Sequence, residues 1–126
     1  MSGDHDAILA ANEAFYRAFR EGDAVAMDAV WARRAEVACI HPGAAPLGGR
    51  EEVMDSWREI LGGPPPIECV RAQAYQLGDS GFVICGERVP GGVLVATNVF
   101  VREDGAWRMV HHHAGLGVPP EEQAFN

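Results

Sequence analysis

The sequence predicts one α+β domain, an antiparallel sheet with helices on one of its faces. Its 126 residues, 48% of them hydrophobic, are enough for a single domain with its own core. Apolar residues recur at helical spacing through the first sixty residues, whereas β-branched and aromatic runs alternate with turn signals from residue 67 onward. Helices followed by a meander of strands are typical of an α+β fold. We therefore treat residues 1–126 as one domain, with a core over about residues 4–115 and a tail over residues 116–126.

Three helices are expected before residue 67. One apolar stripe predicts an amphipathic helix within residues 1–21, because four side chains recur at steps of three and four: Ile8, Ala11, Phe15 and Phe19. Asp23 is a good N-cap for a short second helix. A third helix begins near Arg50 and ends at a Gly-Gly pair that three prolines follow. Between the second and third helices we expect a short strand at residues 36–41 and a loop at residues 42–49.

Four strands are expected in the second half of the chain. Glycine-containing turns separate the runs that predict them, which cover residues 67–77, 82–89, 93–103 and 107–114. The Asp-Gly dipeptide at residues 104–105 is the strongest hairpin signal in the chain. With a two-residue loop there, regular alternation pairs Phe100 with Met109, Asn98 with His111 and Ala96 with His113. This register places His111 and His113 beside Asn98 on one face, and His112 on the other.

The opposite face of this hairpin is flat and β-branched. It carries Val93, Val95, Thr97, Val99 and Val101. A strand pair that is apolar on both faces must be covered on both, and three helices in a chain this short can cover only one. We therefore expect a homodimer in which this outer face packs against a second copy. The alternative is that the C-terminal tail folds over it.

Charge and composition exclude several classes of protein. The formal net charge of −8 comes without a basic cluster, which argues against nucleic acid as a partner. No apolar run approaches about 20 residues, so no membrane span is predicted. The first ten residues lack the features of a secretory signal, and the three cysteines form no CxxC pair. We expect a cytoplasmic protein with reduced thiols.

The histidines near the end of the chain are the main candidates for chemistry. Imidazoles on a helix-covered face are unusual unless they are hydrogen-bonded or line a cavity. Three interpretations are open for His111 and His113: satisfied structural histidines, a polar patch at the bottom of a pocket, or two ligands of a metal site that His41 completes. No carboxylate neighbour supports the metal site. We expect neither a bound metal nor another cofactor.

Glu87 is the third catalytic candidate beside His111 and His113. It follows Gly86 within an apolar strand. On the inner face, a carboxylate in a dry pocket would have a raised pKa and could act as a base. On the outer face it would be a solvated charge at the rim of the sheet. The sequence leaves both orientations open.

Several further residues are expected to contact a substrate. Aromatic side chains on the inner faces of the helices often edge a cavity, because their polar atoms need partners. Asn98 could donate a hydrogen bond to a developing oxyanion. The full set of candidate substrate contacts is Asn98, Tyr16, Trp31, His41, Trp57 and Met109.

Three stretches of the sequence resemble a known superfamily. They are A-C-I-H-P-G (38–43), G-G-R-E-E-V-M-D-S-W (48–57) and T-N-V-F-V-R-E-D-G-A-W-R-M-V-H-H-H-A-G (97–115). They resemble the nuclear-transport-factor-2-like superfamily, which includes ketosteroid isomerases and SnoaL-like polyketide cyclases. The last stretch also resembles the association domain of calcium/calmodulin-dependent kinases. The resemblance covers about residues 4–115.

This resemblance implies a cone-shaped, curved antiparallel sheet wrapped around the three helices of the N-terminal half. It also implies an apolar pocket and dimers formed through the outer sheet face. We expect a small-molecule pocket protein that is an acid–base isomerase, cyclase or hydrolase acting on a small apolar substrate of unknown identity. The alternative is a non-catalytic ligand-binding or dimerisation module, since one fold hosts many functions.

Overall fold

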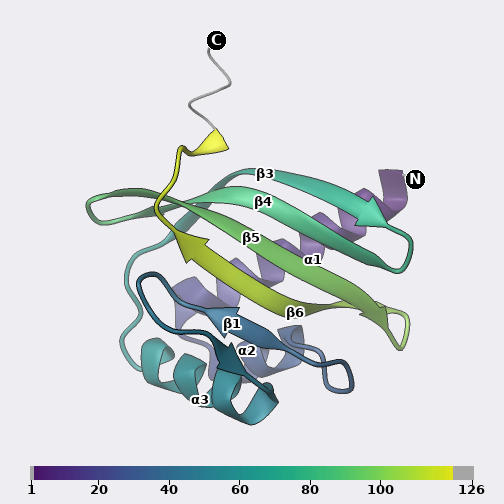
Figure 1. The fold of residues 1–126 in the computed structure, drawn as a ribbon, viewed down its shortest axis with the longest axis horizontal. Helices are drawn as coiled ribbons and strands as arrows, with labels where there is room; N and C mark the ends of the chain where they lie inside the picture. The colour runs from purple at the N-terminus through teal and green to yellow at the C-terminus, as the bar shows by residue number, and fades with distance from the viewer. Residues whose placement is uncertain (1, 121–126) are drawn as a thin grey trace.

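The computed structural model describes residues 2–120, which form a helical layer against one face of a curved six-stranded sheet (Figure 1). The helices are α1 (Ser2–Glu21), α2 (Ala24–Val30) and α3 (Arg50–Leu61). The strands are β1 (Ala38–Ile40), β2 (Leu47–Gly48), β3 (Glu68–Leu77), β4 (Ser80–Val89), β5 (Gly92–Glu103) and β6 (Ala106–Gly115). The strand order is β2-β1-β6-β5-β4-β3. The predicted α+β class is confirmed.

Helix α1 lies along the concave face of the long strands and supplies much of the core (Figure 1). Three residues of its predicted stripe, Ile8, Phe15 and Phe19, are buried as expected, whereas Ala11 is only partly buried. Tyr16, beside Phe15, is fully enclosed. The helix ends at Gly22, whose φ of +64° is the left-handed conformation that glycine adopts without strain. Asp23 then accepts a hydrogen bond from the Ala26 amide at 3.0 Å and caps α2, as predicted.

The short strand β1 extends the sheet beyond the meander. It lies parallel to β6 and pairs Ala38 with His111 and Ile40 with His113. A two-residue strand, β2, then pairs antiparallel with β1 inside the segment for which only a loop was expected. A parallel pair cannot be joined by a tight turn, so hairpin signals could not have revealed the contact between β1 and β6.

The β5–β6 hairpin contains an irregularity that alternation did not predict. The expected pairs Glu103–Ala106 and Phe100–Met109 are present. Beyond them Val99 pairs with His111, so that Val110 is one residue in excess on β6. Such a β-bulge reverses the side-chain alternation of every later residue on its strand relative to the partner.

The bulge therefore overturns the expected orientation of the three histidines. Asn98 lies opposite His112, not His111, and Thr97 rather than Ala96 lies opposite His113. His112 is 1% exposed on the inner face, and His113 is exposed on the other face. The prediction that His111 and His113 point inward was wrong because it assumed an uninterrupted period of two.

Within residues 2–120 we find no helix that combines the length and the apolar character needed to cross a bilayer.

Candidate functional site

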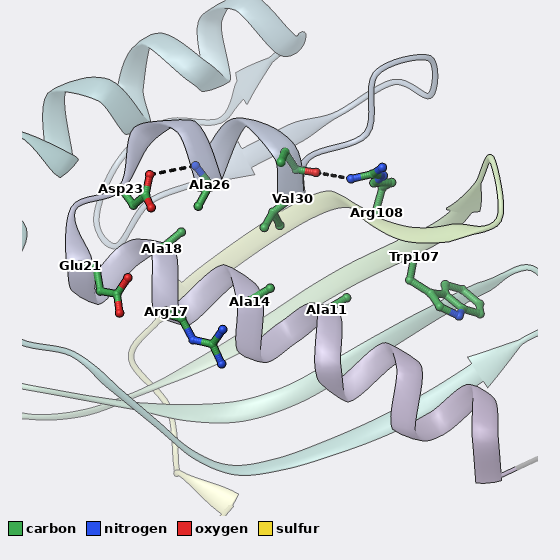
Figure 2. Close-up of a pocket in the computed structure, with 11 residues that line it drawn as sticks. Ala11, Ala14, Arg17, Ala18, Glu21, Asp23, Ala26, Val30, Trp107 and Arg108 are labelled. Carbon is green, nitrogen blue, oxygen red and sulfur yellow. Dashed lines mark hydrogen bonds between the residues drawn. The ribbon is translucent and has the colours of Figure 1, made fainter.

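Several hollows open on the structure, and two of them that touch α1 differ in chemistry. One, about 460 Å³, is an open groove between α1 and α2 (Figure 2). Alanines of both helices form much of its lining, and its charged side chains lie at the surface. Asp23 and Arg108 are already bonded to the backbone of α2, at Ala26 and Ala29. This groove offers no buried acid or base.

The smaller cavity, about 230 Å³, has buried titratable groups in an apolar wall. It lies between the helical layer and the inner face of β4–β6, and its lining residues are Phe19, His41, Pro42, Ile60, Pro65, Ile67, Glu87, Val89, Leu94 and His112. Only His41, Glu87 and His112 contribute ionisable groups among these described residues. We place the candidate site here, because acid–base chemistry needs such groups in a water-poor setting.

Glu87 lies on the inner face of β4, which resolves the two orientations that the sequence left open. Its side chain is almost fully buried, and its Oε2 accepts a hydrogen bond of 2.7 Å from the Tyr16 hydroxyl. Burial raises the pKa of Glu87, and the bond from Tyr16 opposes that rise. The preceding Gly86 has no side chain because Val70 and Val93 fill the space where its Cβ would lie.

His112 faces Glu87 from β6. Its Nε2 lies 3.7 Å from Glu87 Oε2, and its ring packs between Phe15 and Trp57 at centroid distances of 4.9 Å and 5.8 Å. Burial, reinforced by the neighbouring histidines, lowers the pKa of His112 to about 3. Glu87 and His112 therefore form a pair for which burial favours the uncharged form of each member.

Two buried asparagines, Asn98 and Asn12, are hydrogen-bonded to the residues of this pair or to each other. His112 Nδ1 lies 2.6 Å from Asn98 Oδ1, and Asn98 Nδ2 donates to Asn12 Oδ1 at 2.9 Å and to Tyr16 Oη at 3.1 Å. Asn12 was not among the sequence candidates. Its position within the buried stripe of α1, four residues before Tyr16, is the signal that could have found it.

His41 forms part of the cavity wall at the end of β1. Its Nε2 lies 3.0 Å from Ser56 Oγ, and Ser56 donates its own proton to the Val53 carbonyl at 2.7 Å. Ser56 Oγ is therefore the acceptor, and His41 carries its proton on Nε2. Burial lowers the pKa of His41. Trp57 packs edge-on against the ring, at a centroid distance of 4.9 Å.

The other sequence candidates lie outside the cavity lining. Tyr16 and Asn98 are fully buried and do not line the cavity. Tyr16 is hydrogen-bonded to Glu87, and Asn98 is hydrogen-bonded to His112. Trp31 is the C-cap that follows α2, and the backbone oxygen of Met109 accepts a hydrogen bond from the Ala32 amide at 2.9 Å.

His111 and His113 belong to the outer face. His111 Nδ1 lies 3.0 Å from the Ala38 carbonyl oxygen on β1, and the two rings lie 6.2 Å apart. Within residues 2–120 no three His, Cys, Asp or Glu side chains are grouped so that they could hold a metal ion. Cys39, beside His41, is not a nucleophile at neutral pH, since burial raises its pKa to about 12.

A curved sheet closed by helices over an apolar cavity defines a class of small α+β proteins, the cone-shaped folds. The chain belongs to the SnoaL-like domain family, whose model matches residues 8–119. Its fold is that of the nuclear-transport-factor-2-like superfamily, as the resemblance predicted.

Solved structures support this assignment. A candidate dehydratase of the NTF2-like family from Streptomyces avermitilis is 30% identical with a TM-score of 0.84, over 93% of this chain and 98% of that one. A candidate calcium/calmodulin-dependent protein kinase type II association domain from Thiobacillus denitrificans is 40% identical with a TM-score of 0.75, over 86% and 94%.

Among curated proteins, the F-box protein SKIP8 of Arabidopsis thaliana is 31% identical over 123 residues. The match takes in 93% of this chain and 52% of that protein, so the chain spans about half the length of this relative.

Proposed function

We propose that this protein is an acid–base enzyme that acts on a small, uncharged carbonyl compound. The observation that carries the proposal is the Glu87–His112 pair, which is buried at the edge of an apolar cavity with 3.7 Å between Oε2 and Nε2. Burial favours a protonated carboxyl and a neutral imidazole. Such a pair can give one proton and take another without leaving an isolated charge in the cavity.

The cavity lining supports an uncharged substrate. No arginine is among its described lining residues, and the chain contains no lysine. A carboxylate or phosphate would therefore be desolvated there without a cationic partner. A volume of about 230 Å³ corresponds to about eight water molecules at the liquid volume of each, which suits a compact ring or short chain.

Loss of water is the reaction to test first. In a β-hydroxy ketone, a base removes the proton next to the carbonyl while an acid protonates the leaving hydroxyl. The similarity to a candidate dehydratase at 30% identity favours this reaction over a double-bond shift, which needs the same two groups. Because one fold hosts many functions, this similarity is an analogy, and the proposal rests on the Glu87–His112 pair.

The alternative is a non-catalytic binding or association module, which the 40% identity to a candidate kinase association domain favours. We also propose a cytoplasmic location, which the three free thiols support.

Two small probes test the catalytic proposal. The first is solvent deuterium exchange next to the carbonyl of cyclohexanone, followed by NMR. The second is conversion of 3-hydroxycyclohexanone to 2-cyclohexenone, followed by ultraviolet absorbance. We expect both reactions to exceed the buffer rate, and Glu87→Gln and His112→Gln to lose about 100-fold or more.

His113→Gln, on the outer face, is the matched control and should keep the wild-type rate. Wild-type rates no higher than those of Glu87→Gln would contradict catalysis. If cyclohexanone also shifts cavity resonances in that case, the binding module is the correct function.

A further inference from the structure

The proposed function assigns no role to the two buried asparagines, Asn12 and Asn98. Their side chains are nevertheless hydrogen-bonded to each other, to Tyr16 and to His112. Asn98 is 0% exposed and Asn12 is 2% exposed. Both protons of the Asn98 amide have acceptors, Asn12 Oδ1 and Tyr16 Oη, and its oxygen meets His112 Nδ1 at 2.6 Å. Asn12 is itself fixed, because its Nδ2 donates to Cys69 Sγ at 3.6 Å. A buried amide bonded in this way cannot rotate without breaking several hydrogen bonds.

These contacts have a defined direction. An amide nitrogen only donates and an amide oxygen only accepts, so Asn98 must offer its oxygen to the His112 ring. His112 Nδ1 therefore carries a proton. A neutral imidazole has one ring proton, and burial keeps this ring neutral by lowering its pKa to about 3. Nε2 is left with a free lone pair, 3.7 Å from Glu87 Oε2.

We propose that Asn98, held by Asn12, is a positioning residue that keeps the ring proton of His112 on Nδ1 and directs the Nε2 lone pair toward Glu87. Asn98 is thus not the substrate contact that the sequence suggested. It acts through His112, in the way that the hydrogen bond at one ring nitrogen sets the state of the other.

This arrangement assigns the two chemical roles, an assignment that rests on the proposed function. The Glu87 carboxyl is the acid: its proton goes to the leaving hydroxyl, the C–O bond breaks and water departs. His112 Nε2 is the base: it takes the proton next to the carbonyl, and the C–H electrons form the new C=C bond. Transfer of that proton from Nε2 to Glu87 restores both neutral groups.

The same contacts stabilise the charged intermediate state of the pair. Tyr16 donates its hydroxyl to Glu87 Oε2 at 2.7 Å and so supports the carboxylate. Asn98 Oδ1 accepts the Nδ1 proton of the imidazolium. Each member thus has a partner for the charge that it acquires.

The protonation state of the ring can be measured without a substrate. Two-bond proton–nitrogen correlation NMR on uniformly ¹⁵N-labelled protein distinguishes a protonated ring nitrogen from a bare one. We expect His112 to show a protonated Nδ1 and a bare Nε2 throughout the neutral pH range. A proton on Nε2, or equal populations of the two forms, would overturn the proposal, since the amide chain would then run in the opposite direction.

Variants test whether Asn98 is what keeps the ring proton of His112 on Nδ1. Asn98→Leu removes the acceptor at similar volume, and Asn12→Leu removes only the group that orients Asn98. We expect both to populate the Nε2–H form of His112. With 3-hydroxycyclohexanone as the probe, we expect kcat to fall about 10- to 100-fold while KM changes less than about threefold. A purely structural role would leave the ring tautomer unchanged.

His113→Gln is the control and should alter neither the His112 tautomer nor kcat. Should Asn98→Leu not fold, Asn12→Leu and the wild-type spectrum still decide the matter. An Nδ1–H ring in a protein that converts no probe would contradict the proposed function and leave the positioning role intact. Conversion of the probe by a protein whose His112 ring carries its proton on Nε2 would contradict the positioning role and leave the proposed function intact.

Discussion

Glu87 and His112 each lose most of their solvation when the chain folds, and neither ends in a strong ion pair. Glu87 Oε2 and His112 Nε2 are 3.7 Å apart. Burial raises the pKa of Glu87 and lowers that of His112, so it favours the uncharged form of each group. Apolar residues of similar size would fill these positions at lower cost. Polar groups retained at such a cost are typical of functional sites, where stability is exchanged for chemistry.

We expect Glu87→Gln to stabilise the protein at neutral pH. The folded-state pKa of Glu87 is raised above its unfolded value of about 4.3, so its contribution is favourable below that pH and is lost as pH rises through the folded pKa. Gln keeps an acceptor for Tyr16 and cannot ionise. The Tm of Glu87→Gln should therefore exceed that of the wild type at pH 7, and the difference should vanish near pH 4.

Thermal denaturation at the two pH values measures this difference. Glu59→Gln, at an exposed site on α3, is the matched control and should change Tm little. A lower Tm for Glu87→Gln at pH 7 would show that the carboxylate stabilises the fold.

The wild-type protein should lose stability in mild acid because of His112. Its folded pKa of about 3 lies below the unfolded value of about 6.5, so the neutral ring stabilises the fold above pH 6.5. That contribution falls by up to about 1.4 kcal/mol for each pH unit below 6.5. Urea unfolding at pH 6.5 and pH 5 should show a loss of about 2 kcal/mol.

Most of this loss should disappear in His112→Gln. His41 shifts in the same direction and contributes a smaller part, which His41→Gln would identify. An equal loss in His112→Gln would assign the acid sensitivity to other groups.

At the scale of elements, the ends and irregularities of helices and strands place the site. Helix α1 stops where Asp23 donates its amide to the Ala18 carbonyl at 3.0 Å, which closes the helix around Gly22. The chain can then turn back, and α2 packs beside α1. On β6, the excess residue Val110 turns His112 toward the cavity.

Gly22→Ala should be strongly destabilising. Its φ of +64° strains any residue with a Cβ, and that Cβ would lie 2.9 Å from the Leu61 carbonyl oxygen. We expect a loss of about 1–3 kcal/mol in the free energy of unfolding, measured in urea. Gly62→Ala is the control: its φ is −68° and its Cβ would meet nothing closer than 3.4 Å, so it should lie within about 0.5 kcal/mol of wild type. Equal losses for the two variants would contradict this argument.

At the scale of the whole molecule, the helices cover only the concave face of the sheet. The outer face of β5 carries five β-branched residues that are half-buried in the single chain: Val93, Val95, Thr97, Val99 and Val101. We propose that this face packs against the same face of a second copy, because an apolar, β-branched sheet surface of this kind favours sheet-on-sheet packing. A dimer would carry a formal charge of twice −8, that is −16, so salt should strengthen it.

Val99→Arg should convert this dimer to monomer. An arginine at the centre of a two-fold interface would face its own copy, and the two like charges would be desolvated together. Light scattering coupled to gel filtration measures the mass directly. Val25→Arg, at a valine that is 83% exposed on α2, is the control and should leave the mass unchanged. A wild-type protein of 13.6 kDa in this measurement would contradict the proposal.

Most of the fold could be predicted from local patterns. The stripe from Ile8 to Phe19, the cap at Asp23 and the turn at residues 104–105 place α1, α2 and the β5–β6 hairpin close to their observed bounds. These features depend on spacing and on backbone preferences within a few residues, which a sequence displays directly. The candidate site was less predictable, because its groups come from α1, β1, β4, β5 and β6.

The sequence by itself determined the α+β class, the order of the main elements and the closeness of Asn98 to the three histidines of the last hairpin, and it left the orientation of Glu87 open. Only the tertiary structure decided which histidine faces the cavity. Met109 is held by the Ala32 amide, and His111 to His113 are held in register by β1, so the excess residue must be absorbed between them at Val110. Alternation is a local rule, whereas a bulge is set by the partners on both sides of a strand.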